Sequence, residues 1–126
     1  MEIRAYTPAD EATLFAMMRE EGDDWKDYWG NPEKYRRALA GSITFIAWEG
    51  GELAGFARCR DDGGYGLYIY DLLVRKPSRG KYIGRALMEY AAAQFPGAPT
   101  YVMSDVDIYY GGKLGYKREG TIFIVK

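Results

Sequence analysis

The segment from Arg75 to Leu87 holds the residue types best suited to binding an anion. It reads Arg-Lys-Pro-Ser-Arg-Gly-Lys-Tyr-Ile-Gly-Arg-Ala-Leu, so basic side chains and two glycines directly precede a predicted helix. A helix N-terminus presents unpaired backbone N–H groups and the positive end of the helix dipole, which together favour a phosphate group. The segment therefore predicts a pyrophosphate-binding loop. The alternative is a solvated basic turn that only caps the helix.

Two common nucleotide-binding motifs are absent from the chain. No Gly-x4-Gly-Lys-Ser/Thr sequence occurs, and the spacing Gly-x-Gly-x-x-Gly does not occur either. The first motif defines the P-loop and the second the dinucleotide-binding turn. The predicted loop therefore belongs to neither of these two classes.

Upstream of the loop, the sequence predicts a strand, two helices and a three-strand antiparallel meander. The strands alternate apolar and other side chains, and Gly50-Gly51 between two of them is typical of a hairpin turn. The expected ranges are strand 2–6, helices 7–22 and 31–40, and strands 42–48, 53–60 and 65–74. The last of these strands is apolar at nearly every position except Asp71, so we expect it at the centre of the sheet.

Downstream of the loop, apolar side chains share one face of a helix that ends at Pro96-Gly97. A strand over 101–103, a short helical or irregular piece over 106–112 and a terminal strand over Thr121–Val125 follow. A strand, a helix and a strand in succession predict a right-handed parallel crossover. The expected fold is a single α/β (α+β) domain over residues 1–126, with a mixed, mostly antiparallel central sheet, flanking helices and one parallel switch.

The parallel switch matters because ligands bind at the carboxyl ends of strands where the strand order diverges. Here that end is Leu72-Leu73-Val74, immediately before the basic loop. The segment resembles the signature of the GCN5-related N-acetyltransferase (GNAT) family: a strand ending in Leu-x-Val, then Arg or Gln, then Gly-x-Gly opening a helix with an inward Leu. The matching residues are Leu72, Leu73, Val74, Arg79, Gly84 and Leu87.

A second motif extends this resemblance over nearly the whole chain. Tyr109-Tyr110 followed by Lys113-Leu114-Gly115-Tyr116 is similar to the family's later motif, a Tyr shortly before Leu-Gly-Phe/Tyr. Two positions depart from the pattern. Tyr82 stands where the family has its first Gly, which is acceptable at negative φ and costly at positive φ. One extra Gly before Leu114 predicts a bulge or a longer turn.

The resemblance implies acetyl transfer from acetyl-coenzyme A to an amine, by direct attack in a ternary complex and without a metal. In the family, pantetheine pairs with the splayed strand, here Leu72, Leu73 and Val74, and the pyrophosphate lies on the loop. The implied loop residues are Arg79, Gly80, Lys81, Tyr82, Ile83, Gly84 and Arg85. A non-catalytic sensor or interaction module that binds an acyl-CoA on the same fold is the alternative function.

The reaction requires two proton transfers. An alkylammonium has a pKa of about 10.4, so a carboxylate or a water relay must remove its proton before attack. Asp71, beside the splay, is the nearest acid in sequence, and a purely structural role for it is the alternative. Tyr110 is the candidate acid for the leaving thiolate, Tyr109 is its rival, and ordinary packing is the alternative role for Tyr110.

Five acidic residues lie between the first two predicted helices: Glu20, Glu21, Asp23, Asp24 and Asp27. They alternate with Trp25, Tyr28 and Trp29 in a stretch that borders the acceptor side in the family. They form either a solvated helix end or the wall of a pocket that attracts a cation. The expected acceptor is a small or cationic primary amine.

Composition excludes several other classes. The chain has no His and a single Cys, so it cannot form a Ser-His-Asp or Cys-His site, an internal disulfide or a zinc site of its own thiolates and imidazoles. A net charge of −1 argues against binding nucleic acid or a membrane surface. The expected location is the cytoplasm, and a homodimer is compatible with the sequence.

Overall fold

Five strands form one sheet in the order β1-β2-β3-β4-β5, in a computed structural model that describes all 126 residues. Neighbouring strands from β1 to β4 are antiparallel, and β5 runs parallel to β4. The strands are β1 (Glu2–Ala5), β2 (Ile43–Glu49), β3 (Glu52–Asp61), β4 (Leu67–Val74) and β5 (Thr100–Val102). The predicted mixed sheet with one parallel switch is confirmed.

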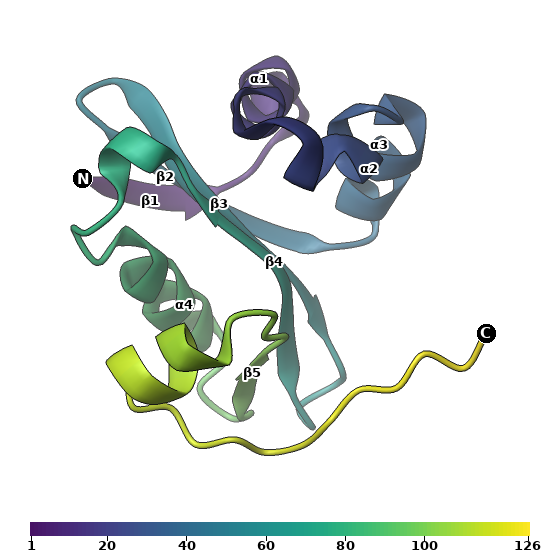
Figure 1. Cartoon of the computed structure of the whole chain (residues 1–126), viewed down its shortest axis with the longest axis vertical. Coiled ribbons are helices and arrows are strands. Elements are labelled where there is room, and N and C mark those ends of the chain that lie inside the picture. The colour runs from purple at the N-terminus through teal and green to yellow at the C-terminus, as the bar shows by residue number, and fades with distance from the viewer.

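The helices lie on both faces of this sheet (Figure 1). One layer holds α1 (Glu11–Glu21), α2 (Lys26–Trp29) and α3 (Pro32–Ala40), and the opposite face is covered by α4 (Ile83–Gln94). Shorter helical turns are η1 (Pro8–Asp10), η2 (Gly22–Trp25), η3 (Lys76–Ser78) and η4 (Ile108–Lys113). No helix combines the length and apolar character needed to cross a membrane.

Local sequence explains where the N-terminal helices begin. The Thr7 amide donates to Asp10 Oδ2 at 2.9 Å, and Pro8 opens η1, where a missing N–H costs nothing. Asn31 caps α3, because its side-chain oxygen accepts from the Lys34 amide at 3.4 Å. Both start signals were visible in the sequence, and the first leads into α1 by way of η1.

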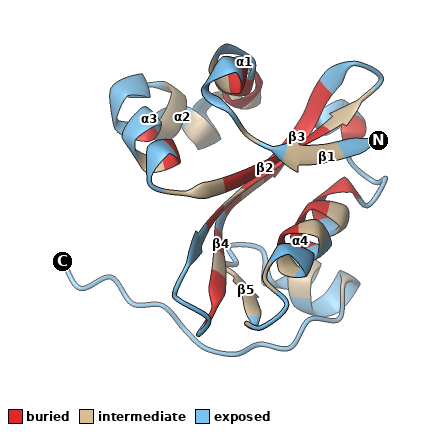
Figure 2. Cartoon of the chain, turned by 180° about the vertical axis from the view of Figure 1, so that it is seen from behind, coloured by how far each residue is buried: buried red, intermediate tan, exposed pale blue.

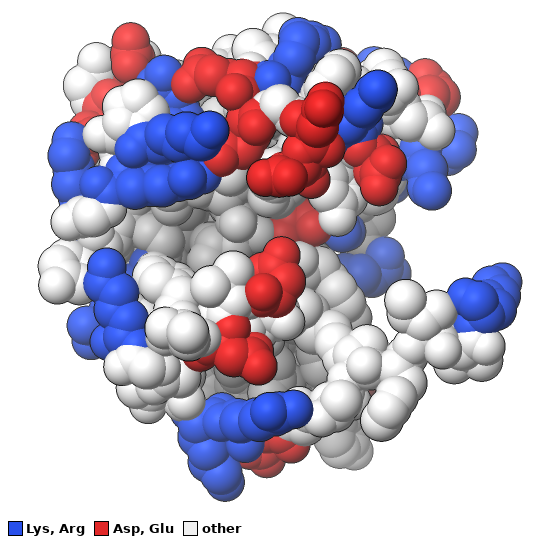
Figure 3. All heavy atoms as spheres, viewed as in Figure 1, with Lys and Arg blue, Asp and Glu red and all other residues white.

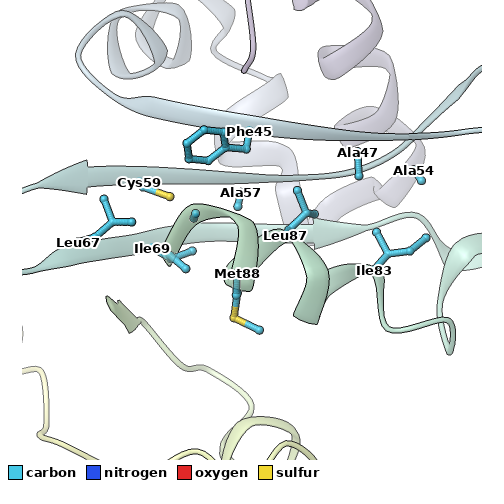
Figure 4. Close-up of a cluster of buried hydrophobic side chains, with 11 residues drawn as sticks. Phe45, Ala47, Ala54, Ala57, Cys59, Leu67, Ile69, Ile83, Leu87 and Met88 are labelled. Carbon is cyan, nitrogen blue, oxygen red and sulfur yellow. The ribbon is translucent and has the colours of Figure 1, made fainter. Parts of the chain in front are cut away.

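Two apolar cores hold the layers together, one on each face of the sheet (Figure 2). Figure 4 shows the core beneath α4, where Leu87 and Ile83 pack against Ala57 and neighbouring strand residues. Cys59 lies in this core, fully buried, and burial raises the pKa of its thiol to about 12. The second core joins α1 and α3 to β2, β3 and the end of β4.

The predicted terminal strand over Thr121–Val125 is wrong. The residues after η4 form no strand, and Figure 1 shows this tail running away from the sheet. The exposed fraction of the side chains rises from 65% at Ile122 to 98% at Val125. These residue types have high strand propensity, but a strand also requires a hydrogen-bonded neighbour. No backbone hydrogen bond joins the tail to β5, the nearest edge of the sheet.

Candidate active site

The parallel strands β4 and β5 separate part-way along β4. Their pairing covers Leu67 to Ile69 of β4, and the Met103 amide donates to the Ile69 carbonyl at 3.0 Å as the last bond between them. From Tyr70 to Val74, β4 therefore has no strand partner on this side. This is the splay that the family resemblance implied, and Figure 1 shows β4 continuing past the short β5.

A bulge in β4 coincides with the start of the splay. Arg58 pairs with Asp71 and Cys59 with Ile69, so Tyr70 is left without a partner across the ladder. An extra residue changes the face to which the following side chains point. As a result, Leu73 packs into the core beneath α1 and α3, whereas Leu72 and Val74 pack on the α4 side.

The open edge of β4 presents backbone donors. Leu73 pairs with Phe56 of β3, and a Cβ on Gly55 would lie 2.7 Å from the Leu73 carbonyl oxygen, so that carbonyl faces β3. Polar groups of successive residues in a strand point to opposite sides. The N–H groups of Leu72 and Val74 therefore point to the open side, where an extended ligand can pair with them.

The loop after β4 holds a continuous run of free amides. None of the backbone N–H groups of Gly80–Arg85 donates to another group of the protein, and the first amide bonded within this turn is that of Ala86, to the Tyr82 carbonyl at 3.0 Å. Unpaired amides at the first turn of a helix of this length favour an anion. The run directly adjoins the open edge of β4.

Tyr82 adopts the conformation that the sequence analysis identified as costly. Its φ is +60° and its ψ is +26°, and it is the only residue other than glycine with positive φ. The left-handed region costs an ordinary residue about 1–2 kcal/mol. The side chain is 61% exposed, so burial of the ring does not offset this cost.

Arg79 holds the loop in place through its side chain. Its Nε donates to the Val74 carbonyl at 2.9 Å, and its Nη2 bonds the Glu21 carboxylate of α1. Arg75 likewise bonds Glu20 at 3.1 Å and Glu52 at 3.1 Å. Glu20 and Glu21, for which the sequence left open a solvated helix end or an acceptor wall, thus join α1 to the loop.

The extra glycine before Leu114 is accommodated as a π-helical turn. Residues Ile108–Lys113 form η4, and the Leu114 amide donates to the Tyr109 carbonyl five residues earlier at 3.0 Å. Such turns occur mostly as one-residue insertions and are frequent at functional sites. The wider turn determines which of the two adjacent tyrosines faces the loop.

Tyr109 and Tyr110 point to different surroundings. The Tyr109 hydroxyl lies 3.3 Å from the position of a Cβ on Gly84, within the first turn of α4. Tyr110 instead packs against the core beneath α4. Its burial, followed by the nearby Asp105 carboxylate, raises the pKa of Tyr110 to about 12. Tyr109 is therefore the tyrosine that reaches the loop.

Asp71 lies in a buried polar cluster. Its Oδ2 accepts from the Tyr35 hydroxyl at 2.7 Å and from Arg58 Nε at 2.5 Å, and Arg58 also donates to Ser42 Oγ at 3.0 Å. Burial, followed by the Asp71 charge, raises the pKa of Tyr35, so this phenol stays a proton donor. The cluster joins α3 to β3 and β4.

Charges of both signs act on the hydroxyl of Tyr28 on α2. Burial is the largest cause that raises the pKa of Tyr28; the charges of Asp71, Asp27 and Asp105 raise it further, and the charge of Arg58 lowers it. Its ring contacts Trp25 at 5.1 Å between centroids and Tyr35 at 5.2 Å. Figure 3 shows acidic side chains above and below a hollow that crosses this face of the molecule.

The sequence predicted no role for Asp105, and it gave Lys113 only as part of the motif that ends in Leu114-Gly115-Tyr116. Asp105 follows β5 by three residues, so it lies past the carboxyl end of a strand at the parallel switch, where ligand-binding residues gather. This position could have identified Asp105 as a candidate site residue from the sequence. Nothing in the sequence indicated where the Lys113 side chain would lie, because this depends on the π-helical turn.

The geometry is that of a sheet splayed at a parallel switch, with free amides on the following helix. The family model of the acetyltransferase (GNAT) family matches residues 11–107. The chain belongs to the GNAT family. The comparison with curated protein sequences gave no significant match.

Solved structures of other GNAT-family proteins share this fold. A GNAT acetyltransferase from Streptococcus pneumoniae TIGR4 is 19% identical with a TM-score of 0.73, over 98% of this chain and 96% of that one. An aminoglycoside acetyltransferase from an uncultured soil metagenomic sample is 26% identical with a TM-score of 0.72, over 99% and 97%. An aminoglycoside 6′-N-acetyltransferase complexed with coenzyme A is 20% identical with a TM-score of 0.67, over 86% and 70%.

Proposed function

We propose that the whole chain is one catalytic domain that transfers an acetyl group from acetyl-CoA to a primary amine. The observation that carries this proposal is the run of free amides at Gly80–Arg85, directly beside the unpaired edge of β4. Amides can hold a pyrophosphate, and the strand edge can pair with the amide-containing pantetheine arm. A related structure complexed with coenzyme A supports this assignment.

The proposed reaction is a direct displacement. The neutral amine nitrogen attacks the thioester carbonyl, the C–N bond forms, and collapse of the tetrahedral species breaks the C–S bond. The Leu72 amide on the open edge is the proposed donor to the oxyanion, because it points to the side where the thioester would lie. The thiolate then takes a proton, and the amine nitrogen loses one.

Tyr109 is the proposed acid for the thiolate. Its hydroxyl lies beside Gly84 at the start of α4, and Leu72 and Val74 of the open strand border the same point, 3.7 and 3.6 Å from the position of a Gly84 Cβ. Tyr110 is the alternative, but its ring packs into the core and its pKa is raised to about 12. A phenol with a pKa that far above a thiol is a weaker donor.

Asp71 is proposed to position the site rather than to take the proton itself. Its Oδ2 already accepts two hydrogen bonds, from Tyr35 and Arg58, and its side chain is 5% exposed. Such a carboxylate holds its partners and has one oxygen left for a ligand. The ammonium proton then leaves through water in the hollow, with direct transfer to Asp71 as the alternative.

The proposed acceptor is a small amine that carries more than one positive charge. The charges of Asp71, Asp27 and Asp105 all act on the Tyr28 hydroxyl and outnumber that of Arg58, and the rings of Trp25 and Tyr28 pack together with 5.1 Å between their centroids. Carboxylates and aromatic faces both attract ammonium groups. Two related structures are of aminoglycoside acetyltransferases, which supports a polycationic acceptor.

Calorimetric titration with CoA, followed by a thiol-release assay with acetyl-CoA, tests the proposal. The amine panel should contain an aminoglycoside, a polyamine, a lysine-containing peptide and a neutral-tailed monoamine. We expect CoA binding and fastest thiol release with a polycationic amine. CoA binding without release by any amine would favour the non-catalytic alternative, and no CoA binding by folded protein would overturn the cofactor assignment.

A further inference from the structure

Most positive charge in the basic loop is already neutralised. Four of the five cationic side chains between Arg75 and Arg85 form ion pairs with carboxylates, and Lys76 is the exception. The pairs are Arg75 with Glu20 and Glu52, Arg79 with Glu21, Lys81 with Glu49, and Arg85 with Glu89. A paired cation attracts a further anion less strongly, so the loop offers amides more than side-chain charge.

Among the cations outside the loop that form no ion pair, Lys113 lies beside aromatic rings of the loop and of η4. Lys113, at the end of η4, takes part in none of the ion pairs of the chain. Its Nζ lies 5.8 Å from the ring centroid of Tyr82 and 5.9 Å from that of Tyr109. Both distances are within the range of cation–π attraction. The ammonium is therefore held by two aromatic rings and leaves its charge available.

Both rings lie beside the free amides of the loop. Tyr82 is the residue immediately before α4, and the Tyr109 hydroxyl reaches Gly84 in the first turn of that helix. Lys113 thus approaches the amides of Gly80–Arg85 from η4, the element that faces the loop. Its three donors and full charge complement amides that bind a phosphate from the other side.

We propose that Lys113 binds a phosphate group of CoA from the wall opposite the loop, with Tyr82 and Tyr109 positioning its ammonium. This inference rests on the proposed function, because it presumes that CoA occupies the loop. The proposal also explains why a residue with a side chain occupies this strained position. Glycine would adopt φ +60° without strain, but it has no ring to hold the lysine.

Calorimetric titration of CoA into wild type, Lys113→Met and Lys117→Met tests the proposal. Lys117 is the matched control, because it lies on the same segment, is 86% exposed and pairs with Glu119 at 3.5 Å. We expect Lys113→Met to raise Kd about 10- to 100-fold, the loss of one charge-assisted hydrogen bond, and Lys117→Met to change it little. Lys113→Arg, which keeps the charge, should restore most of the affinity.

Two further measurements separate the outcomes. With dephospho-CoA, the penalty of Lys113→Met vanishes if Lys113 bonds the 3′-phosphate and persists if it bonds the pyrophosphate; either result supports the proposal. Equal Kd values for CoA in wild type and Lys113→Met overturn it. A Lys113→Met defect that Lys113→Arg does not rescue, with a lowered Tm, assigns Lys113 a structural role instead. If wild type does not bind CoA, it is the proposed function that fails, and the failure is distinguishable from a failure of this inference.

Discussion

The Tyr109 hydroxyl and the Cα of Gly84 are in close approach, with 3.3 Å between that oxygen and the position a Cβ on Gly84 would occupy. This contact joins η4 to the first turn of α4 across the splay. It is possible because the π-helical turn directs Tyr109 toward the loop and because residue 84 has no side chain. Both features lie at the proposed cofactor site.

Replacing Tyr109 with Phe should lower kcat by about 10²–10³-fold, the scale of a lost general acid, with little change in KM for acetyl-CoA. The matched variant Tyr110→Phe should keep nearly all of kcat, because the Tyr110 side chain packs against the core beneath α4 and the pKa of its hydroxyl is raised to about 12. Steady-state thiol release measures both. A larger loss in Tyr110→Phe would return the acid role to Tyr110, and undiminished kcat in both would mean that the thiolate is protonated by water.

Gly84→Val should weaken CoA binding more than Gly97→Val does. A branched side chain at Gly84 would enter the space of the Tyr109 hydroxyl and of Val74 and Leu72, at 3.3, 3.6 and 3.7 Å, and would block the approach of phosphate to the backbone. Gly97 is the control, because a Cβ there meets nothing within 4 Å. Kd for CoA and Tm should be measured together. A lower Tm with unchanged Kd would assign Gly84 to helix packing alone.

Tyr82→Gly should stabilise the protein by about 1 kcal/mol, because glycine adopts the left-handed conformation without the strain of a side chain. Tyr82→Ala is the matched variant: it removes the ring and leaves the strain at φ +60°. Denaturant unfolding of both variants measures the difference. If glycine and alanine give equal stabilities, the backbone at residue 82 carries no strain. Both variants should weaken CoA binding if the ring positions Lys113.

Replacing Asp27 and Asp105 together with Asn should raise KM for a polycationic acceptor and leave KM for acetyl-CoA unchanged. Both charges act on the Tyr28 hydroxyl, so their removal weakens attraction for a cation near that residue. The control is Asp61→Asn with Asp62→Asn, the same charge change at the last residue of β3 and the residue that follows it. The acceptor assignment fails if the two double variants have the same KM for the acceptor.

The ion pair of Arg4 and Asp10 should make stability depend on pH. Hydrogen bonds from Arg4 at 2.9 and 2.8 Å lower the pKa of Asp10 to about 2, below its unfolded value of about 3.9. A depressed folded pKa contributes stability above the unfolded pKa, and this contribution is lost as pH falls from about 4 to about 2. The Tm difference between wild type and Asp10→Asn should therefore be present at neutral pH and shrink through that window. A constant difference at all pH values would show that the charge of Asp10 does not contribute.

The sequence alone predicted the five strands from β1 to β5 and the helices α1, α3 and α4 between them, and it located the basic loop between β4 and α4. Apolar alternation located β2 and β3, Gly50-Gly51 located their hairpin, and the helical face from Ile83 onward located α4. These signals are local, because each depends on the period of one element or on the backbone freedom of glycine. The basic, glycine-containing stretch after β4 was readable for the same reason.

Only the tertiary structure decided which side chains meet at the site. Arg79 of the loop forms an ion pair with Glu21 of α1, far away in sequence. Asp71 accepts hydrogen bonds from Tyr35 and Arg58, and Lys113 lies over the ring of Tyr82. The tyrosine that approaches Gly84 depended on how η4 accommodated one extra residue, and the terminal segment formed no strand because no backbone hydrogen bond joins it to β5. Propensity and spacing describe one segment at a time, whereas each of these outcomes depends on what a second segment places beside it.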